Sequence, residues 1–238
     1  MYRYEDIKEV HLEITQKCQA ACPMCDRNMN GGDDNPHITN AELSLEDAKK
    51  MFSPAFIKQL NVMYMCGNLG DPIVAKDTLE VFKYFREHND KIWLSMNTNA
   101  GAKSAEWWTE LAGVIGRKGA VIFSVDGLKD TIKKKSGRFI TSDIKPKTSH
   151  QAINRKGAET QNLAQPKDEK NKNIALLKQK EIEKSYGSMK EYLDKCSITC
   201  KVAKQGSIFV TAEGLLMPCC WTAGRMYKCR RKTRHKYN

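Results

Sequence analysis

The sequence predicts an α/β protein made of repeated strand-helix units with a parallel sheet. Two observations lead to this prediction. In the first half of the 238-residue chain, short apolar runs alternate with helical patterns, and four of these runs end in a polar or glycine-bearing loop. A chain of this length can bury one sizeable core plus a small appendage. Because ligands gather at the carboxyl ends of the strands in β/α barrels, we expect the four loops to face one site.

The expected strands are short and follow one another through the first half of the chain. In the first of them, apolar residues recur at every second position, and the run leads straight into a cluster of cysteines. The second, third and fourth runs each end at a loop that carries glycine, asparagine or aspartate. The four strands are expected at residues 10–14, 61–65, 92–96 and 121–125.

The helices expected between these strands have recognisable start signals or apolar faces. Ser44 stands where a helix N-cap is expected, and Asp47 would be the acid at the third helical position. Further helices are expected over residues 78–88 and 104–115, where apolar residues recur at helical spacing.

After residue 128 the strand-helix alternation stops. Residues 133–173 are rich in Lys, Ser, Thr, Gln and Asn, so we expect a long loop or linker there. A polar helix interrupted near Gly187 should follow over residues 174–195. The chain then divides into a core at 1–128, a polar linker and helix at 129–195, a hairpin with strands at 207–211 and 215–217 within residues 196–224, and a basic tail at 225–238.

Charge is distributed unevenly along the chain. The net charge of +12 arises from −4 over residues 1–128 and +16 over residues 129–238. The last 14 residues contain seven Lys or Arg and no acid, but Tyr227 and Tyr237 are their only aromatic residues. A solvated end is therefore expected, and nucleic acid is not an expected partner.

Composition indicates a protein of a reducing compartment. The mean hydropathy is −0.60, and no run approaches the roughly 18 apolar residues that a membrane helix needs. The opening MYRYEDIKEV has acids where a secretory signal would have an apolar core. We therefore expect a cytoplasmic protein without a membrane partner, in which clustered thiols among the nine cysteines indicate metal binding or catalysis.

Three cysteines fall within eight residues: Cys18, Cys22 and Cys25. Thiolates bind soft metals, as zinc or as iron-sulfur clusters. A structural zinc site needs four ligands, and His11 and His37 stand at no recognised spacing for it. Three cysteines suit a four-iron cluster with one iron left open to a substrate.

The same cysteines could instead line one face of a buried helix, because they stand at i, i+4 and i+7. Pro23 and the polar residues around the first cysteine, Gln16, Lys17 and Gln19, argue against that alternative.

This C-x3-C-x2-C loop after a first strand resembles the hallmark of the radical S-adenosylmethionine (SAM) superfamily. The resemblance implies a partial (β/α) barrel and a [4Fe-4S] cluster held by Cys18, Cys22 and Cys25. It also implies reductive cleavage of SAM to methionine and a 5'-deoxyadenosyl radical that abstracts hydrogen from a substrate. An electron donor such as flavodoxin or ferredoxin would then be a partner.

The loop after the second expected strand, Gly-Asn-Leu-Gly-Asp-Pro, resembles the glycine-glycine-glutamate-proline motif of that superfamily, whose backbone meets the SAM amino group. Gly67 and Gly70 would allow the close backbone approach. Asp71 stands where glutamate is usual, which keeps the charge and shortens the reach. Taken alone, such a sequence is also an ordinary turn.

Two further loops and one single residue resemble SAM-contacting parts of the superfamily. The loop Asn97-Thr98-Asn99 after the third strand, and Ser124 and Asp126 after the fourth, resemble loops that touch the ribose and methionine of SAM. Met24 occupies the position before the third cysteine, which packs near the adenine in the superfamily. A core methionine would explain Met24 equally well.

A second cysteine pattern, C-x13-G-x4-C from Cys200 to Cys219, resembles the opening of a SPASM or twitch extension. The resemblance implies an auxiliary iron-sulfur cluster on a small hairpin extension. The later run of cysteines in a complete SPASM module is missing, since only Cys229 follows the adjacent pair Cys219 and Cys220. Buried or free thiols are the alternative, and Cys196 and Cys220 are substitute ligands.

The resemblance covers residues 7–128 and is incomplete. The family's core has six strands, and residues 129–175 show no counterpart of the last two, so slow SAM cleavage is expected. Two functions stay open: a radical SAM enzyme with an unknown substrate, for which a peptide is an analogy with SPASM-bearing families, or a non-catalytic or truncated iron-sulfur protein.

Overall fold

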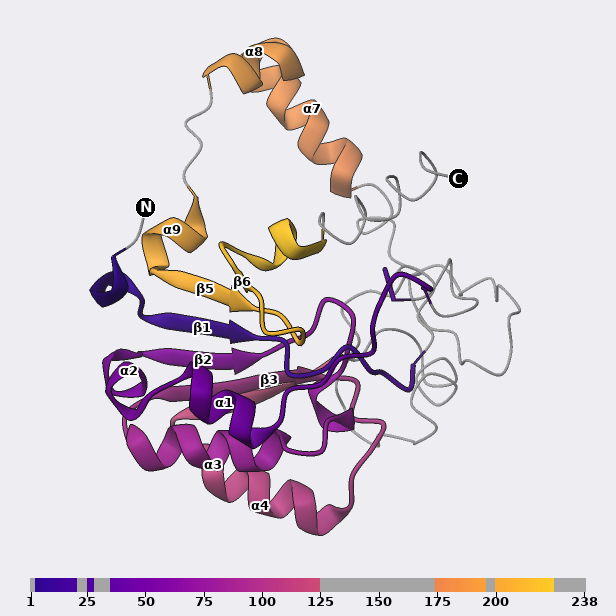
Figure 1. Cartoon of the computed structure of the whole chain (residues 1–238). Coiled ribbons are helices and arrows are strands. Elements are labelled where there is room, and N and C mark those ends of the chain that lie inside the picture. The colour runs from indigo at the N-terminus through magenta and orange to yellow at the C-terminus, as the bar shows by residue number, and fades with distance from the viewer. Residues whose placement is uncertain (1–2, 21–24, 28–34, 125–173, 196–199, 225–238) are drawn as a thin grey trace, which may run out of the picture.

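The computed structural model describes residues 3–20, 25–27, 35–124, 174–195 and 200–224. In these ranges the chain forms a six-stranded sheet in the order β4-β3-β2-β1-β5-β6 (Figure 1). Five strands run parallel and β6 is antiparallel to its neighbour. The sheet of the described residues is not closed, as expected of a partial α/β barrel.

The four strands expected in the first half are confirmed, with shifted ends. They are β1 (Glu9–Leu12), β2 (Val62–Met65), β3 (Trp93–Thr98) and β4 (Gly119–Phe123). One expectation was wrong in detail: Asn97 and Thr98 were expected in a loop but are the last residues of β3. They belong to the strand because they continue the β4 register, opposite Ile122 and Phe123.

The expected helices α1 (Leu45–Met51), α3 (Thr78–His88) and α4 (Ala105–Ile115) are also confirmed. Ser44 Oγ accepts the N–H of Asp47 at 3.2 Å, and the Asp47 carboxylate accepts the N–H of Ser44 at 3.0 Å, so the predicted cap is a complete capping box. A further helix, α2 (Pro54–Gln59), was not expected. It follows a serine N-cap and begins with proline, and both features are common at the start of a helix.

The main core lies between the sheet and helices α1 to α4. Figure 1 shows α1, α3 and α4 on the same side of the sheet. Fully burying each large apolar side chain stabilises the fold by about 1.5–3 kcal/mol. The buried set includes Val10, Leu12, Met63, Met65, Leu94 and Met96 from the strands, and Phe52, Ile57, Phe82, Phe85, Leu111 and Ile115 from the helices and their ends.

The described part of the second half includes helices α7, α8 and α9 and a hairpin. The interrupted polar helix is confirmed as α7 (Ile174–Tyr186) and α8 (Met189–Lys195), separated at Gly187 with φ 86°. After α9 (Lys201–Gln205), the expected hairpin is formed by β5 (Ser207–Val210) and β6 (Leu216–Met217).

The hairpin is part of the main sheet. This pairing was not predicted from the sequence. Strand β5 pairs in parallel with β1, from Glu9 opposite Ser207 to Leu12 opposite Val210. All four residues of β5 are buried, which is typical of a parallel strand covered on both faces. β1 is therefore an interior strand with β2 on one side and β5 on the other.

Several expectations concern residues outside the described ranges. These are the linker over residues 133–173, the lack of two further strands in residues 129–175, and the basic tail at 225–238. Among the helices that the structure describes, none is both long enough and apolar enough to cross a membrane.

The entry into β5 gives a first prediction. Gly206 has φ 61°, and a Cβ there would overlap the carbonyl oxygen of Asp6. Gly206→Ala should therefore lower the free energy of unfolding by about 1–3 kcal/mol. Gly113→Ala in α4 is the matched control, since nothing lies within 4 Å of its Cβ position, and it should raise that free energy by about 0.5–1 kcal/mol. Urea unfolding measures both, and equal stability of Gly206→Ala and wild type would contradict the β5–β1 pairing.

Candidate functional site

The cysteine loop after β1 lies beside the loop after β3. Cys18 Sγ accepts a hydrogen bond from Asn99 Nδ2 at 3.6 Å and another from the backbone N–H of Ala20 at 3.4 Å. Asn99 is oriented by Gln19, whose Nε2 donates to Asn99 Oδ1 at 2.6 Å. N–H donors of this kind favour the thiolate form of a cysteine and support metal-bound sulfur.

The glycine loop after β2 packs backbone to backbone against the residues that lead to Cys18. A Cβ at Gly70 would overlap the carbonyl group of Thr15, and a Cβ at Gly67 would overlap the backbone of Gly70. The N–H of Asp71 donates to the carbonyl oxygen of Lys17 at 2.9 Å. Both glycines are therefore required by close approach within the protein.

Asp71 joins the glycine loop to the end of β3. Its buried carboxylate accepts the Thr98 hydroxyl at 2.7 Å, the N–H of Asn99 at 2.7 Å and the N–H of Ile73 at 3.1 Å. Hydrogen bonds to an ionised carboxylate are roughly twice as strong as neutral ones. The predicted residues Asp71 and Thr98 thus come together, bound to each other.

Two buried polar side chains fasten the long segment that follows the cysteines. Gln16 Oε1 accepts the N–H groups of Thr39 and Ala41, both at 3.2 Å. Arg27 donates from Nη1 to the carbonyl oxygen of Gln16 and to Asn40 Oδ1. Sequence reasoning missed Gln16 and Arg27, because their partners lie in an irregular segment without a periodic pattern.

The three predicted cluster ligands are only partly described. Cys18 and Cys25 are partly buried, while Cys22 and the predicted adenine neighbour Met24 lie outside the described residues. Burial raises the pKa of the Cys25 thiol, so binding a metal there would release a proton. Within the described ranges, no group of three His, Cys, Asp or Glu side chains could hold a metal ion.

The remaining predicted SAM residues occupy different surroundings. Asn97 donates from Nδ2 to Cys66 Sγ at 3.4 Å, and burial raises the pKa of the Cys66 thiol. Ser124 is exposed, and its N–H donates to the carbonyl oxygen of Thr98 at 2.8 Å. Asp126 lies outside the described residues.

Two titratable side chains, one in β1 and one directly after it, were not predicted to be part of the site. His11 bonds through Nε2 to the carbonyl oxygen of Cys66, and burial lowers its pKa to about 4. Glu13 has no exposed surface; its Oε1 accepts the N–H of Leu69 at 2.8 Å, and burial raises its pKa to about 7. The signal was present, since both fall on the face of the first strand opposite its apolar residues.

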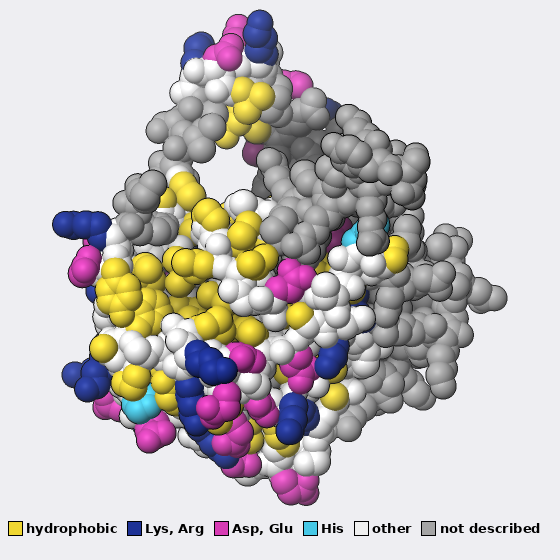
Figure 2. All heavy atoms as spheres, in the orientation of Figure 1, with side chains coloured by type: hydrophobic (Ala, Val, Ile, Leu, Met, Phe, Trp, Pro, Cys, Tyr) yellow, Lys and Arg dark blue, Asp and Glu magenta, His cyan; other side chains and the backbone are white. Residues whose placement is uncertain are grey.

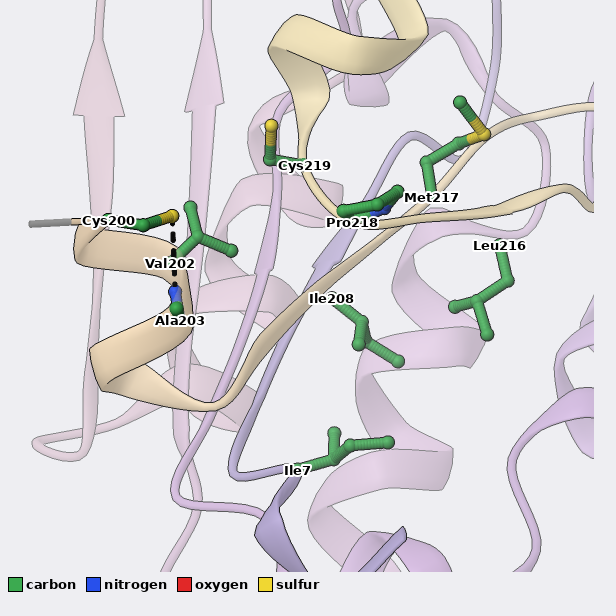
Figure 3. Close-up of a pocket in the computed structure, with 9 residues that line it drawn as sticks. All are labelled: Ile7, Cys200, Val202, Ala203, Ile208, Leu216, Met217, Pro218 and Cys219. Atoms are coloured by element: carbon green, nitrogen blue, oxygen red, sulfur yellow. Dashed lines mark hydrogen bonds between the residues drawn. The ribbon is translucent and has the colours of Figure 1, made fainter. Parts of the chain in front are cut away.

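The two cysteines predicted for an auxiliary cluster line one cavity of about 500 Å³ (Figure 3). Cys200 Sγ, before α9, accepts the N–H of Ala203 at 3.5 Å, and Cys219 Sγ lies 3.3 Å from the hydroxyl of Thr222. Burial raises the pKa of Cys219, but hydrogen bonds from Thr222 and Trp221 outweigh it and leave that pKa below its usual value.

The rest of the cavity is largely apolar, with Ile7, Ile208 and Leu216 in its lining. Hydrophobic side chains gather over the β1 and β5 part of the sheet in Figure 2. Of the substitute ligands, Cys220 is half-buried and its carbonyl oxygen accepts Asn68 Nδ2 at 2.7 Å. Cys196 lies outside the described residues.

Over the described residues the chain forms an open, mostly parallel sheet, and the cysteine-bearing segment follows its first strand. The sequence matches no protein-family model and no curated protein. Among solved structures, it is similar to BtrN in a complex with AdoMet and 2-DOIA, with a TM-score of 0.50 and 14% sequence identity. The match covers 90% of this chain and 73% of BtrN. At this identity the likeness shows the fold alone.

The buried pair of His11 and Glu13 gives a pH prediction. Between pH 4.5 and about 7 the folded chain keeps a proton on Glu13 that the unfolded chain releases, so this group makes stability fall as pH rises. Between about 4 and 6.5 the unfolded chain binds a proton on His11 that the folded chain excludes, so this group makes stability rise with pH. The two effects oppose each other in the wild type.

Glu13→Gln removes one of the two effects. The free energy of unfolding of this variant should rise by ~3 kcal/mol from pH 4 to 6.5, while the wild type changes much less between pH 4.5 and 6.5. Urea unfolding of the cluster-free protein across pH 4 to 7.5 checks this, with the exposed Glu46→Gln as control. Parallel pH curves for wild type and Glu13→Gln would show that the pKa of Glu13 is not raised in the folded chain.

Proposed function

We propose that this chain is a radical SAM enzyme. The observation that carries the proposal is the position of Asn99: its side chain donates to Cys18 Sγ, and its backbone N–H donates to the Asp71 carboxylate. One residue thus joins the cysteine loop, the glycine loop and the end of β3. The four sequence motifs that resemble the superfamily occur in order on four strands, and the fold is that of a protein solved with AdoMet.

Cys18, Cys22 and Cys25 would hold a [4Fe-4S] cluster. The donor chemistry fits: the residues are thiols, and the sulfur of Cys18 already accepts two N–H groups. When bound, the cluster supplies the electron that cleaves SAM and so starts radical chemistry on a substrate. Gln16 and Arg27 keep the loop that carries the cysteines in place.

SAM would lie on the loops at the carboxyl ends of β1 to β4. Gly67 and Gly70 let the glycine loop pack against the backbone of Thr15 and of the loop itself, which fixes the shape of the loop, and exposed Ser124 offers a hydroxyl. Asp71 and Thr98 are buried and bound to each other, so they shape the site from beneath. Asn97, Asp126 and Met24 complete the proposed contacts.

The partners and the second cluster follow from the same proposal. Flavodoxin or ferredoxin would supply electrons in the cytoplasm, and the substrate is unassigned, with a peptide as the class suggested by the SPASM-like pattern. Cys200 and Cys219 share one largely apolar cavity, which supports an auxiliary iron-sulfur cluster completed by further ligands.

The test is anaerobic reconstitution with iron and sulfide, followed by a SAM cleavage assay with a strong reductant. The proposal requires about four irons per chain, rising toward eight if the auxiliary cluster forms. It also requires release of 5'-deoxyadenosine from SAM. A reducible cluster that never cleaves SAM would favour the non-catalytic iron-sulfur protein, and bound zinc would exclude both functions.

Each cluster ligand can be tested singly. Cys18→Ala, Cys22→Ala and Cys25→Ala should each lose most of the iron at the first cluster, because each residue supplies one ligand. Cys66→Ala is the matched control, since its thiol is bonded to Asn97 and is not a proposed ligand; it should keep the iron. Iron analysis and electron paramagnetic resonance measure the outcome, and full reducible iron in the three single variants would refute the ligand assignment.

The glycine loop gives a separate prediction for SAM. Gly70→Ala would force the loop away from Thr15, and SAM affinity should fall about tenfold or more, the equivalent of 1.4 kcal/mol. The cluster should remain, since Gly70 touches no proposed ligand. Calorimetry on the reconstituted protein measures the affinity, with Gly113→Ala as the matched glycine control. Equal affinity in Gly70→Ala and wild type would remove this loop from the SAM site.

A further inference from the structure

The backbone N–H groups of the glycine loop are turned toward the protein interior. The N–H of Leu69 donates to Glu13 Oε1 at 2.8 Å, and the N–H groups of Asn68 and Gly70 lie near enough to the same carboxyl to lower its pKa. The next N–H, that of Asp71, donates to the carbonyl oxygen of Lys17. Successive N–H groups that converge in this way form a nest, an arrangement that commonly binds an anion. Here the protein's own carboxyl group occupies it.

This arrangement decides which ligand chemistry the loop can offer. A glycine-rich loop with free N–H groups would bind a phosphate or a carboxylate. Within the described part of the chain, the carbonyl oxygens of residues 67–70 take no part in any hydrogen bond. A loop that presents carbonyl acceptors suits a cationic N–H group, such as an α-ammonium.

Glu13 is itself held firmly in place. Its side chain has no exposed surface, and its backbone N–H donates to the carbonyl oxygen of Val210 on β5 at 2.9 Å. Its second oxygen, Oε2, has no hydrogen-bond partner among the described residues. The side chain therefore acts on the glycine loop through one oxygen at a fixed distance.

We propose that Glu13 is a positioning residue for SAM: it holds the N–H groups of residues 68–70 inward and so presents the carbonyl oxygens of the loop to the SAM ammonium group. Glu13 does not touch SAM in this arrangement. The inference rests on the proposed radical SAM function. The positioning role requires a side-chain acceptor oxygen at the distance that the glutamate side chain reaches. It does not require the negative charge of the carboxylate.

Three substitutions separate reach from charge. Glu13→Gln keeps the acceptor oxygen and removes the charge. Glu13→Asp keeps the charge but ends one methylene short of the loop. Glu13→Leu fills a similar volume and leaves the buried N–H groups of the loop without an acceptor, which costs free energy unless the loop rearranges.

The experiment measures two quantities for these variants. Calorimetry of the anaerobically reconstituted protein gives SAM affinity, and hydrogen exchange of the SAM-free protein gives the protection of amides 68–70. Glu13→Gln should stay within about threefold of wild type, and Glu13→Asp and Glu13→Leu should bind SAM about tenfold or more weakly, with faster exchange. Glu46→Leu, an exposed position on α1, is the control and should change neither quantity.

The outcomes are distinguishable. Unchanged SAM affinity in Glu13→Asp and Glu13→Leu would overturn the positioning role, and so would a loss in Glu13→Gln as large as that in Glu13→Leu. Iron content and cooperative unfolding show whether each variant folds. If Glu13→Leu does not fold, the comparison of Glu13→Gln with Glu13→Asp still tests the positioning role. If wild type itself binds no SAM, the proposed function fails, and this inference fails with it.

Discussion

The candidate site depends on the two hydrogen bonds of Asn99. Parallel strands bring their loops to one edge of the sheet, but that alone leaves the loops free to differ in conformation. The Asn99 N–H binds the Asp71 carboxylate and its side chain binds Cys18 Sγ, so three loops are fixed with respect to one another. Because Asp71 is buried, loss of a donor would leave a costly unsatisfied carboxylate, which strongly favours this one arrangement.

The C-terminal hairpin takes part in the same arrangement. β5 pairs with β1 directly before the cysteine loop, and the turn of the hairpin reaches the segment behind the cysteines, where Thr39 Oγ1 donates to Glu213 at 2.9 Å. Asn68 of the glycine loop reaches the carbonyl oxygen of Cys220. The two cysteine regions therefore share one rigid sheet, and a change in the hairpin should be felt at the glycine loop through Glu13.

Most of the regular structure could be predicted from the sequence, because it rests on local signals. The four strands follow from short apolar runs, and α1 follows from the Ser44 and Asp47 capping box. The parallel pairing of β1 with β5 could not be predicted. It joins segments from opposite ends of the chain, and parallel pairing leaves no turn signal between them.

The chemistry of the site was predictable only where a motif exists. The cysteine spacing indicated cluster ligands, and Cys22, Met24 and Asp126 stay predictions. Gln16 and Glu13 were missed because the role of a buried polar side chain depends on its hydrogen-bond partners, and these partners come from other strands or from irregular loops. Asn99 was expected in the polar loop after the third strand, but its bonds to Cys18 and Asp71 could not be predicted for the same reason.

The most direct test of the account is pulsed electron-nuclear spectroscopy of the reduced, reconstituted protein with SAM labelled with ¹⁵N at its amino group. If the three loops joined by Asn99 form one site for the cluster and SAM, the spectrum will contain a ¹⁵N coupling to the cluster, and Asn99→Ala will weaken or remove it. A reduced cluster with no ¹⁵N coupling at saturating SAM would contradict the account, because it would place SAM, if bound at all, away from the cysteine loop.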